Sequence, residues 1–225
     1  MADTLKAADV SARPELTDWR FMLGRIEAAF HAGSFDVAGR FVAQIGELAQ
    51  AADHHPNVDL RYPDLVHVVL STHSDRGVTE KDVALATSIS ELAASSGYGS
   101  EPLSVRSVEV GIDALDIDLI LPFWRAVLGY EDGPPAPGEQ PNDLFDPAGI
   151  GPAVWFQQMD APRPQRNRIH FDVTVPHDVA EQRIADAIAA GGHITYDAEA
   201  PAFVVLADAE GNEACVCTWQ NRENR

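Results

Sequence analysis

Histidine side chains gather in one stretch of the chain, residues 54–82. His54 and His55 are adjacent, His73 follows eighteen residues after His55, and Asp82 closes the stretch. Histidine has an unperturbed pKa of about 6.5, so an imidazole can both donate and accept a proton near neutral pH. Three imidazoles brought together by the fold would suit a reaction that moves protons to and from a substrate.

The local sequence predicts how the backbone would hold these side chains. Pro56 disfavours a helical conformation for the residue before it, so the histidine pair should lie where a helix gives way to extended chain. Residues 65–72 alternate in the period of two that is typical of a strand with one buried face, and His73 falls at its end. Thr79 and Asp82 are three residues apart, the spacing of a capping box that opens a helix.

The same residues also have purely structural interpretations. A His-His-Pro sequence can be a polar surface turn, and the capping box alone accounts for Asp82. The sequence therefore leaves two roles open for Asp82, as the capping acid of a helix or as the carboxylate that orients a histidine.

Two apolar segments precede the histidines. Apolar residues three or four apart predict a helix from Thr17 through about Phe30. Ser34 is expected to cap a second helix, whose apolar positions continue to Ala49 and deliver the chain to the histidine pair.

The second half of the chain contains a weak internal repeat. An extended segment at 105–112 is followed by a helical segment at 119–128, and a second extended segment at 168–175 is followed by a helix at 179–190. Residues 133–152 are rich in proline and glycine, which predicts a long irregular loop between the copies. Two copies of a strand-helix-strands unit imply a pseudo-symmetric α+β domain.

Composition excludes several classes of protein. The 225 residues carry 35 Asp and Glu against 16 Lys and Arg, a net charge of −19 without a basic patch, so nucleic acid is not an expected partner. No run of eighteen apolar residues predicts a membrane span. The first residues lack a basic region followed by an apolar one, so we expect no signal peptide. Cys215 and Cys217 share one face of a predicted strand and are badly placed to pair. We expect a cytoplasmic protein with reduced thiols.

Residues 17–96 resemble the pterin-4a-carbinolamine dehydratase family. The family pattern is His-His-Pro, a Tyr six residues after the Pro, a strand that ends in Thr-His, then Gly, Thr and Asp, and it is found here as His54-His55-Pro56, Tyr62, Thr72-His73, Gly77, Thr79 and Asp82. The chain departs from the family at Val58, where a Trp is usual.

The resemblance implies removal of water from a 4a-hydroxytetrahydropterin, without a metal or an organic cofactor. It implies a small-molecule pterin as the partner and a homo-oligomer, either a dimer or a tetramer. The implied catalytic residues are His54, His55, His73 and Asp82. The implied substrate-binding residues are Pro56, Val58, Tyr62 and Thr72. Because relatives in the family also act as protein-binding cofactors, a binding or dimerisation module is the alternative function, and Val58 is the residue that favours it.

Residues 105–220 resemble the glyoxalase-like branch of the vicinal oxygen chelate superfamily, through the segments FWRAVLGYE, NRIHFDV and LADAEGNEACVC. In members that use a metal, the ligands come from the first and last strands of each repeat. The matching positions here are Glu109, His170, Gln157 and Cys215, and such a set could bind a divalent metal. His170 and Asp172 could equally form a structural hydrogen-bonded pair. A third hypothesis places the activity here, as a metal-dependent lyase, isomerase or dioxygenase.

Together the two resemblances predict an α+β protein of two domains. The first would be an antiparallel sheet with helices on one face, and the second would consist of paired βαβββ modules. We expect a flexible leader at 1–16, the first domain at 17–96, a linker at 97–104 and the second domain at 105–220.

Overall fold

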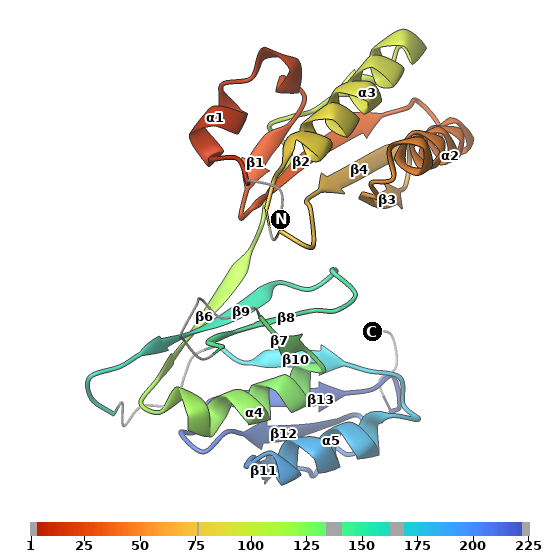
Figure 1. Ribbon diagram of the computed structural model, residues 1–225. Helices are drawn as coiled ribbons and strands as arrows, with labels where there is room; N and C mark the ends of the chain where they lie inside the picture. The colour runs from red at the N-terminus through yellow and green to blue at the C-terminus, as the bar shows by residue number, and fades with distance from the viewer. Residues whose placement is uncertain (1–3, 76, 134–140, 163–168, 222–225) are drawn as a thin grey trace. The chain divides into compact units, whose positions relative to one another are not determined.

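The computed structural model describes residues 4–75, 77–133, 141–162 and 169–221 (Figure 1). The chain divides into two compact units, Met1–Ser107 and Val108–Arg225. Both combine helices with sheets, as the α+β prediction requires. Within the described residues, no helix is long and apolar enough to cross a membrane.

The first unit is an antiparallel sheet that carries helices on one face (Figure 1). Four strands lie in the order β1-β2-β4-β3, and β5 pairs with the edge of β2. The elements, in chain order, are α1 (Ala7–Ser11), the 3-10 helix η1 (Pro14–Leu16), β1 (Arg20–Met22), β2 (Arg25–His31), α2 (Phe35–Ala52), β3 (Asn57–Arg61), β4 (Leu65–Leu70), α3 (Glu80–Ser96) and β5 (Gly99–Ser100).

Buried and half-buried side chains alternate along β4, so one face of the sheet packs against the core. Val66, Val68 and Leu70 are buried, whereas His67 and Val69 on the opposite face are only half-buried. The buried face packs with aromatic residues such as Phe30 of β2 and Phe41 of α2, whose rings meet edge to face with centroids 5.7 Å apart. The predicted strand at 65–72 and the predicted helix after Ser34 are confirmed by β4 and α2.

The predicted helix from Thr17 through Phe30 is wrong, because this segment forms the hairpin of β1 and β2. Leu23 and Gly24 form its turn with φ angles of 47° and 77°, a left-handed conformation that ends any right-handed helix. The apolar spacing is ambiguous, because residues four apart, such as Ile26 and Phe30, share one face in a helix and also in a strand. Pairing along β4 then favours the strand, and this pairing is not visible in the local sequence.

The segment after α3 belongs to the sheet of the first unit. Gly99 and Ser100 were predicted as part of a linker, but they form β5 opposite His31 and Phe30 of β2. The amide of Glu101 continues this pairing by donating to the carbonyl of Ala29 at 2.9 Å.

His31 adds an electrostatic contact at this edge. Its Nδ1 lies 3.0 Å from Asp64 Oδ1, and its Nε2 lies 3.4 Å from Glu101 Oε2. The hydrogen bond to Asp64, with a smaller contribution from Glu101, raises the pKa of His31 above its ordinary value. The imidazole of His31 therefore joins the residue before β4 to the residue that follows β5.

The second unit consists of two βαβββ modules, as predicted (Figure 1). Their sheets have the orders β6-β9-β8-β7 and β10-β13-β12-β11, and in each the first strand is parallel to the last. The first module comprises β6 (Glu109–Ala114), α4 (Ile117–Leu128), β7 (Glu131–Asp132), β8 (Asp143–Phe145) and β9 (Ala153–Gln158). The second comprises β10 (Phe171–Thr174), α5 (Ala180–Ala189), β11 (His193–Tyr196), β12 (Phe203–Ala207) and β13 (Glu213–Cys217).

The proline-rich stretch predicted as an irregular loop is partly ordered into secondary structure. It contains β8, and its residues 134–140 lie outside the described residues. The expected strand at 168–175 is β10, and Arg168 also lies outside the described part of the chain.

Each module closes its last hairpin on an aspartate. Asp146, after β8, accepts hydrogen bonds from the backbone amides of Ala148, Ile150 and Gly151. Asp208, after β12, is fully buried and accepts from the amides of residues 210 and 212 and, at 3.0 Å, from the indole Nε1 of Trp124 on α4. The hydrogen bond from Trp124 to Asp208 joins the two modules, because Trp124 belongs to the first module and Asp208 to the second.

We predict that Trp124→Phe lowers the free energy of unfolding by about 1–3 kcal/mol, because it removes one hydrogen-bond donor from a buried carboxylate. Urea unfolding followed by circular dichroism measures the change. Trp219→Phe is the matched control, since this indole is 63% exposed and should change stability by less than about 0.5 kcal/mol. Equal effects of the two substitutions would contradict the role given to Asp208.

We also predict that His31 stabilises the first unit most at low pH. Because folding raises its pKa, the stabilisation is complete below the unfolded value of about 6.5 and is lost as the pH rises through the folded pKa. The stability difference between the wild type and His31→Gln, measured by urea unfolding across this range, should therefore shrink as the pH rises. A difference that grows with pH would refute the assignment.

Candidate active site

His54 is held at the point where α2 ends. Asp53 adopts a left-handed conformation with φ 46°, which stops the helix, and the amide of His54 then donates to the carbonyl of Ala49 at 3.1 Å. This turn directs the imidazole inward, so that His54 is only 9% exposed. Its Nε2 lies 2.6 Å from Oδ1 of Asp82, which is fully buried.

The second carboxylate oxygen of Asp82, Oδ2, accepts hydrogen bonds from the start of α3 and from the segment after β4. Oδ2 accepts from the backbone amide of Thr79 at 2.7 Å, which completes the capping box of α3. It also accepts from Thr72 Oγ1 at 2.7 Å, just beyond the end of β4. The hydroxyls of Thr72 and Thr79 lie 2.7 Å apart, so the group is closely connected. Capping and contact with a histidine, which the sequence offered as alternatives, occur together.

The contact with Asp82 determines which nitrogen of His54 can take part in chemistry. A carboxylate accepts hydrogen bonds, so His54 donates from Nε2. Nδ1 is then the ring nitrogen that can exchange a proton with a substrate. A buried carboxylate behind an imidazole also fixes the orientation of the ring.

His55 and His73 differ from His54 in being exposed. Within the described residues neither side chain makes a hydrogen bond or an ion pair, so both imidazoles are available to a ligand. His73 is carried by a short loop that is closed by the backbone bond from the amide of Thr72 to the carbonyl of Gly77, at 2.8 Å.

The predicted substrate-binding residues are in different environments. Thr72 is buried beside Asp82, and Pro56 is half-buried. Tyr62 is 89% exposed. Val58, at the position of the usual Trp, is half-buried and packs against the core of the first unit.

A second carboxylate–imidazole pair, which was not predicted from the sequence, lies on the other face of the sheet. Glu27 of β2 is 1% exposed, and its carboxylate contacts His67 Nε2 at 3.0 Å and Arg25 Nε at 2.6 Å. Burial alone would raise the pKa of Glu27, but the hydrogen bonds from His67 and Arg25 outweigh it and lower the pKa. A glutamate within an otherwise apolar strand pattern is the signal that could have revealed it.

A third cluster lies in the second unit, on β10, the residue before it and β13. The ligand atoms of His170, Asp172 and Cys215 all lie within 4.8 Å of one another. His170 and Cys215 were predicted as metal ligands, whereas Asp172 was considered only as a structural partner of His170. Glu109, exposed at the start of β6, is not part of the cluster. Burial, followed by the hydrogen bond to Asp172, raises the pKa of the Cys215 thiol to about 12.

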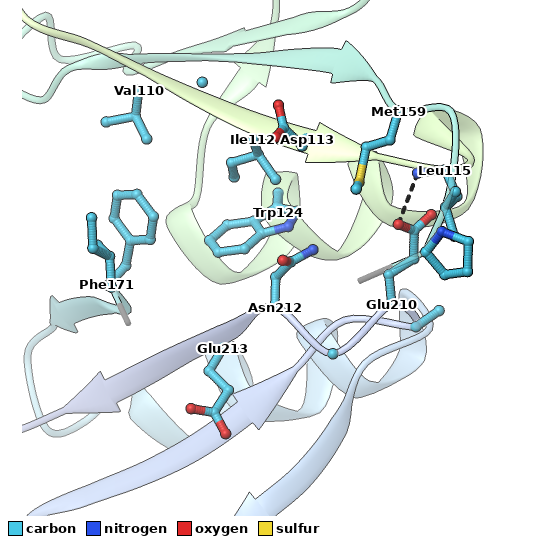
Figure 2. Close-up of a pocket in the computed structure, with 15 residues that line it drawn as sticks. Val110, Ile112, Asp113, Leu115, Trp124, Met159, Phe171, Glu210, Asn212 and Glu213 are labelled. Carbon is cyan, nitrogen blue, oxygen red and sulfur yellow. Dashed lines mark hydrogen bonds between the residues drawn. The ribbon is translucent and has the colours of Figure 1, made fainter. Parts of the chain in front are cut away.

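A cavity of about 620 Å³ lies between the first strand of the first module and the turn that precedes β13 (Figure 2). Trp124 lies between Ile112 of β6 and Asn212 in this view. Glu210 closes one end by accepting a hydrogen bond from the backbone amide of Leu115 at 2.8 Å. Gln157, the remaining predicted ligand, lines a second cavity of about 320 Å³.

Comparison with known proteins assigns each unit. A family model described as "Pterin 4 alpha carbinolamine dehydratase" matches residues 3–92, and one described as "Glyoxalase-like domain" matches residues 109–217. A protein of Herpetosiphon aurantiacus named "Putative pterin-4-alpha-carbinolamine dehydratase" is 37% identical over 89 residues, which are 40% of this chain and 92% of that protein. The chain belongs to the pterin-4a-carbinolamine dehydratase family.

Other members of the dehydratase family match the same unit. A protein of the same name from Chloroflexus aurantiacus is 41% identical over 86 residues, covering 38% of this chain and 88% of that protein. The crystal structure of a "transcriptional coactivator/pterin dehydratase" from Brucella melitensis is 31% identical, with a TM-score of 0.38, and covers 40% of this chain and 99% of that one. These relatives cover about two fifths of the chain and leave the glyoxalase-like unit unmatched.

We predict that Asp82→Asn destabilises the dehydratase unit by about 2–3 kcal/mol. The substitution replaces a buried acceptor of several hydrogen bonds with a group that must also place two N–H donors. Asp36→Asn is the matched control, because Asp36 also lies in the first turn of a helix but its side chain is 71% exposed. Urea unfolding of both variants measures the difference, and similar losses would show that the buried network adds nothing to ordinary helix capping.

Proposed function

We propose that the first unit dehydrates a 4a-hydroxytetrahydropterin to a quinonoid dihydropterin by histidine acid–base catalysis. The observation that carries this proposal is the buried His54–Asp82 pair, beside two exposed imidazoles with no partner among the described residues. The family membership supports the pterin as substrate. Neither a metal nor an organic cofactor is part of the proposed reaction.

The reaction needs one acid and one base on nearby edges of the pterin ring. The C4a–O bond breaks as the leaving oxygen takes a proton and departs as water. N5 loses its proton, and the electron pair of that N–H bond becomes part of the new C4a=N5 double bond. Atoms and charge then balance without an oxidant.

We assign the acid to His54 and His73, which flank the carbinolamine carbon in this proposal. Nδ1 of His54 would face the leaving oxygen, because Nε2 is bonded to Asp82. His55 would serve as the base at N5 or orient the ring. Asp82 acts through His54 and is a positioning residue, with Thr72 holding its other oxygen.

The proposed substrate contacts differ from those usual in the family at one position. Val58 packs against the core and offers less aromatic surface to a pterin ring than a Trp would. This favours a lower substrate affinity, and it is the observation behind the alternative that the unit is a binding or dimerisation module.

We predict that His73→Ala lowers the rate of dehydration by about 10²- to 10⁴-fold, because one positioned proton-transfer group contributes about that much. Ultraviolet absorption measures the decay of the carbinolamine with and without the protein. His73 is exposed, so its loss should leave the fold intact, and a thermal unfolding curve checks this. His54→Ala should lose a similar factor.

His193→Ala is the control, because this exposed histidine lies in the glyoxalase-like unit. It should retain the wild-type rate. A His73→Ala protein with full turnover would remove His73 from the mechanism. A wild-type protein that does not accelerate the decay at all would instead favour the binding module.

A further inference from the structure

We propose that the second module of the glyoxalase-like unit binds a zinc-type divalent metal ion through His170, Asp172 and Cys215, without Glu109. The resemblance to metal-using relatives implies ligands from both modules, whereas the structure gathers a set from one sheet. This inference concerns the other unit and does not depend on the proposed dehydration.

The strand register explains why these three side chains meet. His170 and Asp172 are two residues apart where the chain enters β10, so they point to the same face. Cys215 is the direct partner of Asp172 in the parallel pairing of β10 with β13. The cluster is therefore produced by the backbone pairing, which gives it a rigid support.

The distances suit a tetrahedral site. Bonds of about 2.0–2.3 Å to a metal place neighbouring ligand atoms roughly 3.3–3.8 Å apart. His170 Nε2 and Asp172 Oδ1 are 3.4 Å apart, and all three ligand atoms lie within 4.8 Å of one another. Small side-chain rotations would bring them to one ion.

The ligand atoms select the kind of metal. One sulfur, one imidazole nitrogen and one carboxylate oxygen suit zinc, whereas magnesium and calcium prefer sites made of oxygen alone. On binding, the thiol of Cys215 loses its proton to solvent and becomes a thiolate. The thiolate and the carboxylate then balance the two positive charges of the ion.

The site would keep a position open for a further ligand. Three protein ligands and one free position are typical of catalytic zinc sites, and four protein ligands of structural ones. The side chains of His170 and Asp172 are about half exposed, while Cys215 lies beneath them at 6% exposure. Solvent can therefore reach the ion. Phe171 and Glu213, the first residues of β10 and β13, line the 620 Å³ cavity beside it.

Cobalt(II) tests the proposal, because it replaces zinc and reports its ligands by absorption. The full chain, treated with a chelator and then dialysed, is titrated with cobalt chloride. We expect about one equivalent to bind, with a thiolate-to-cobalt charge-transfer band in the near ultraviolet and the intense visible bands of a four-coordinate ion. Zinc chloride should displace the cobalt and abolish both signals.

The chain has two cysteines, so the charge-transfer band can be assigned. Cys215→Ser should abolish the band, and Cys217→Ala should retain it. His170→Gln and Asp172→Asn should each weaken cobalt binding by about a hundredfold or more, since even residues behind a ligand contribute 10- to 100-fold. Thermal unfolding of each metal-free variant shows whether it is folded.

Glu109→Gln separates this site from one that uses both modules. We expect its cobalt affinity and spectrum to match the wild type. Absence of a thiolate band in the folded wild type would overturn the proposal and leave the cluster as a hydrogen-bonded structural group. A loss of binding in Glu109→Gln as large as that in Asp172→Asn would also overturn it, in favour of ligands from both modules.

Discussion

The buried carboxylate of Asp82 is the constraint on which the first unit depends. A carboxylate without solvent must have its oxygens satisfied by donors, and here the donors come from three separate elements. His54 follows α2, Thr72 follows β4, and the Thr79 amide opens α3. The positions of two helices and a strand are thus tied to one side chain. The orientation of His54 is consequently set by the same group that begins α3.

Local signals in the sequence were enough to predict the parts around Asp82. The spacing of Thr79 and Asp82 indicated the capping box, and the alternation in β4 indicated the strand. They failed at β1 and β2, because apolar spacing is ambiguous and the Leu23-Gly24 turn was not recognised. Long-range contacts supplied the rest. The hydrogen bond between His54 and Asp82 joins residues 28 positions apart, and only the fold determines that distance.

In the second unit, too, the sequence predicted the elements but not the contacts between distant residues. The weak repeat in the sequence predicted two strand-helix-strands copies, because each copy keeps its hydrophobic period, and the resemblance to glyoxalase-like proteins implied the βαβββ modules. The order of the strands in each sheet came only from the structure. The sequence did not predict which of the proposed metal ligands would lie together. Asp172 joins the cluster because the register of β10 and β13 places it opposite Cys215. A strand pattern fixes which face a side chain occupies, and it does not fix the neighbour across the strand.

The pairing of β5 with β2 has a practical consequence for work on the separate units. A chain ended at Ser96, where α3 stops, would lose β5 and expose the backbone of β2 at Phe30 and His31. Unpaired edges of this kind recruit strands from other molecules and promote aggregation. An expression boundary placed after Ser107 would keep the edge covered and retain the contact of His31 with Glu101.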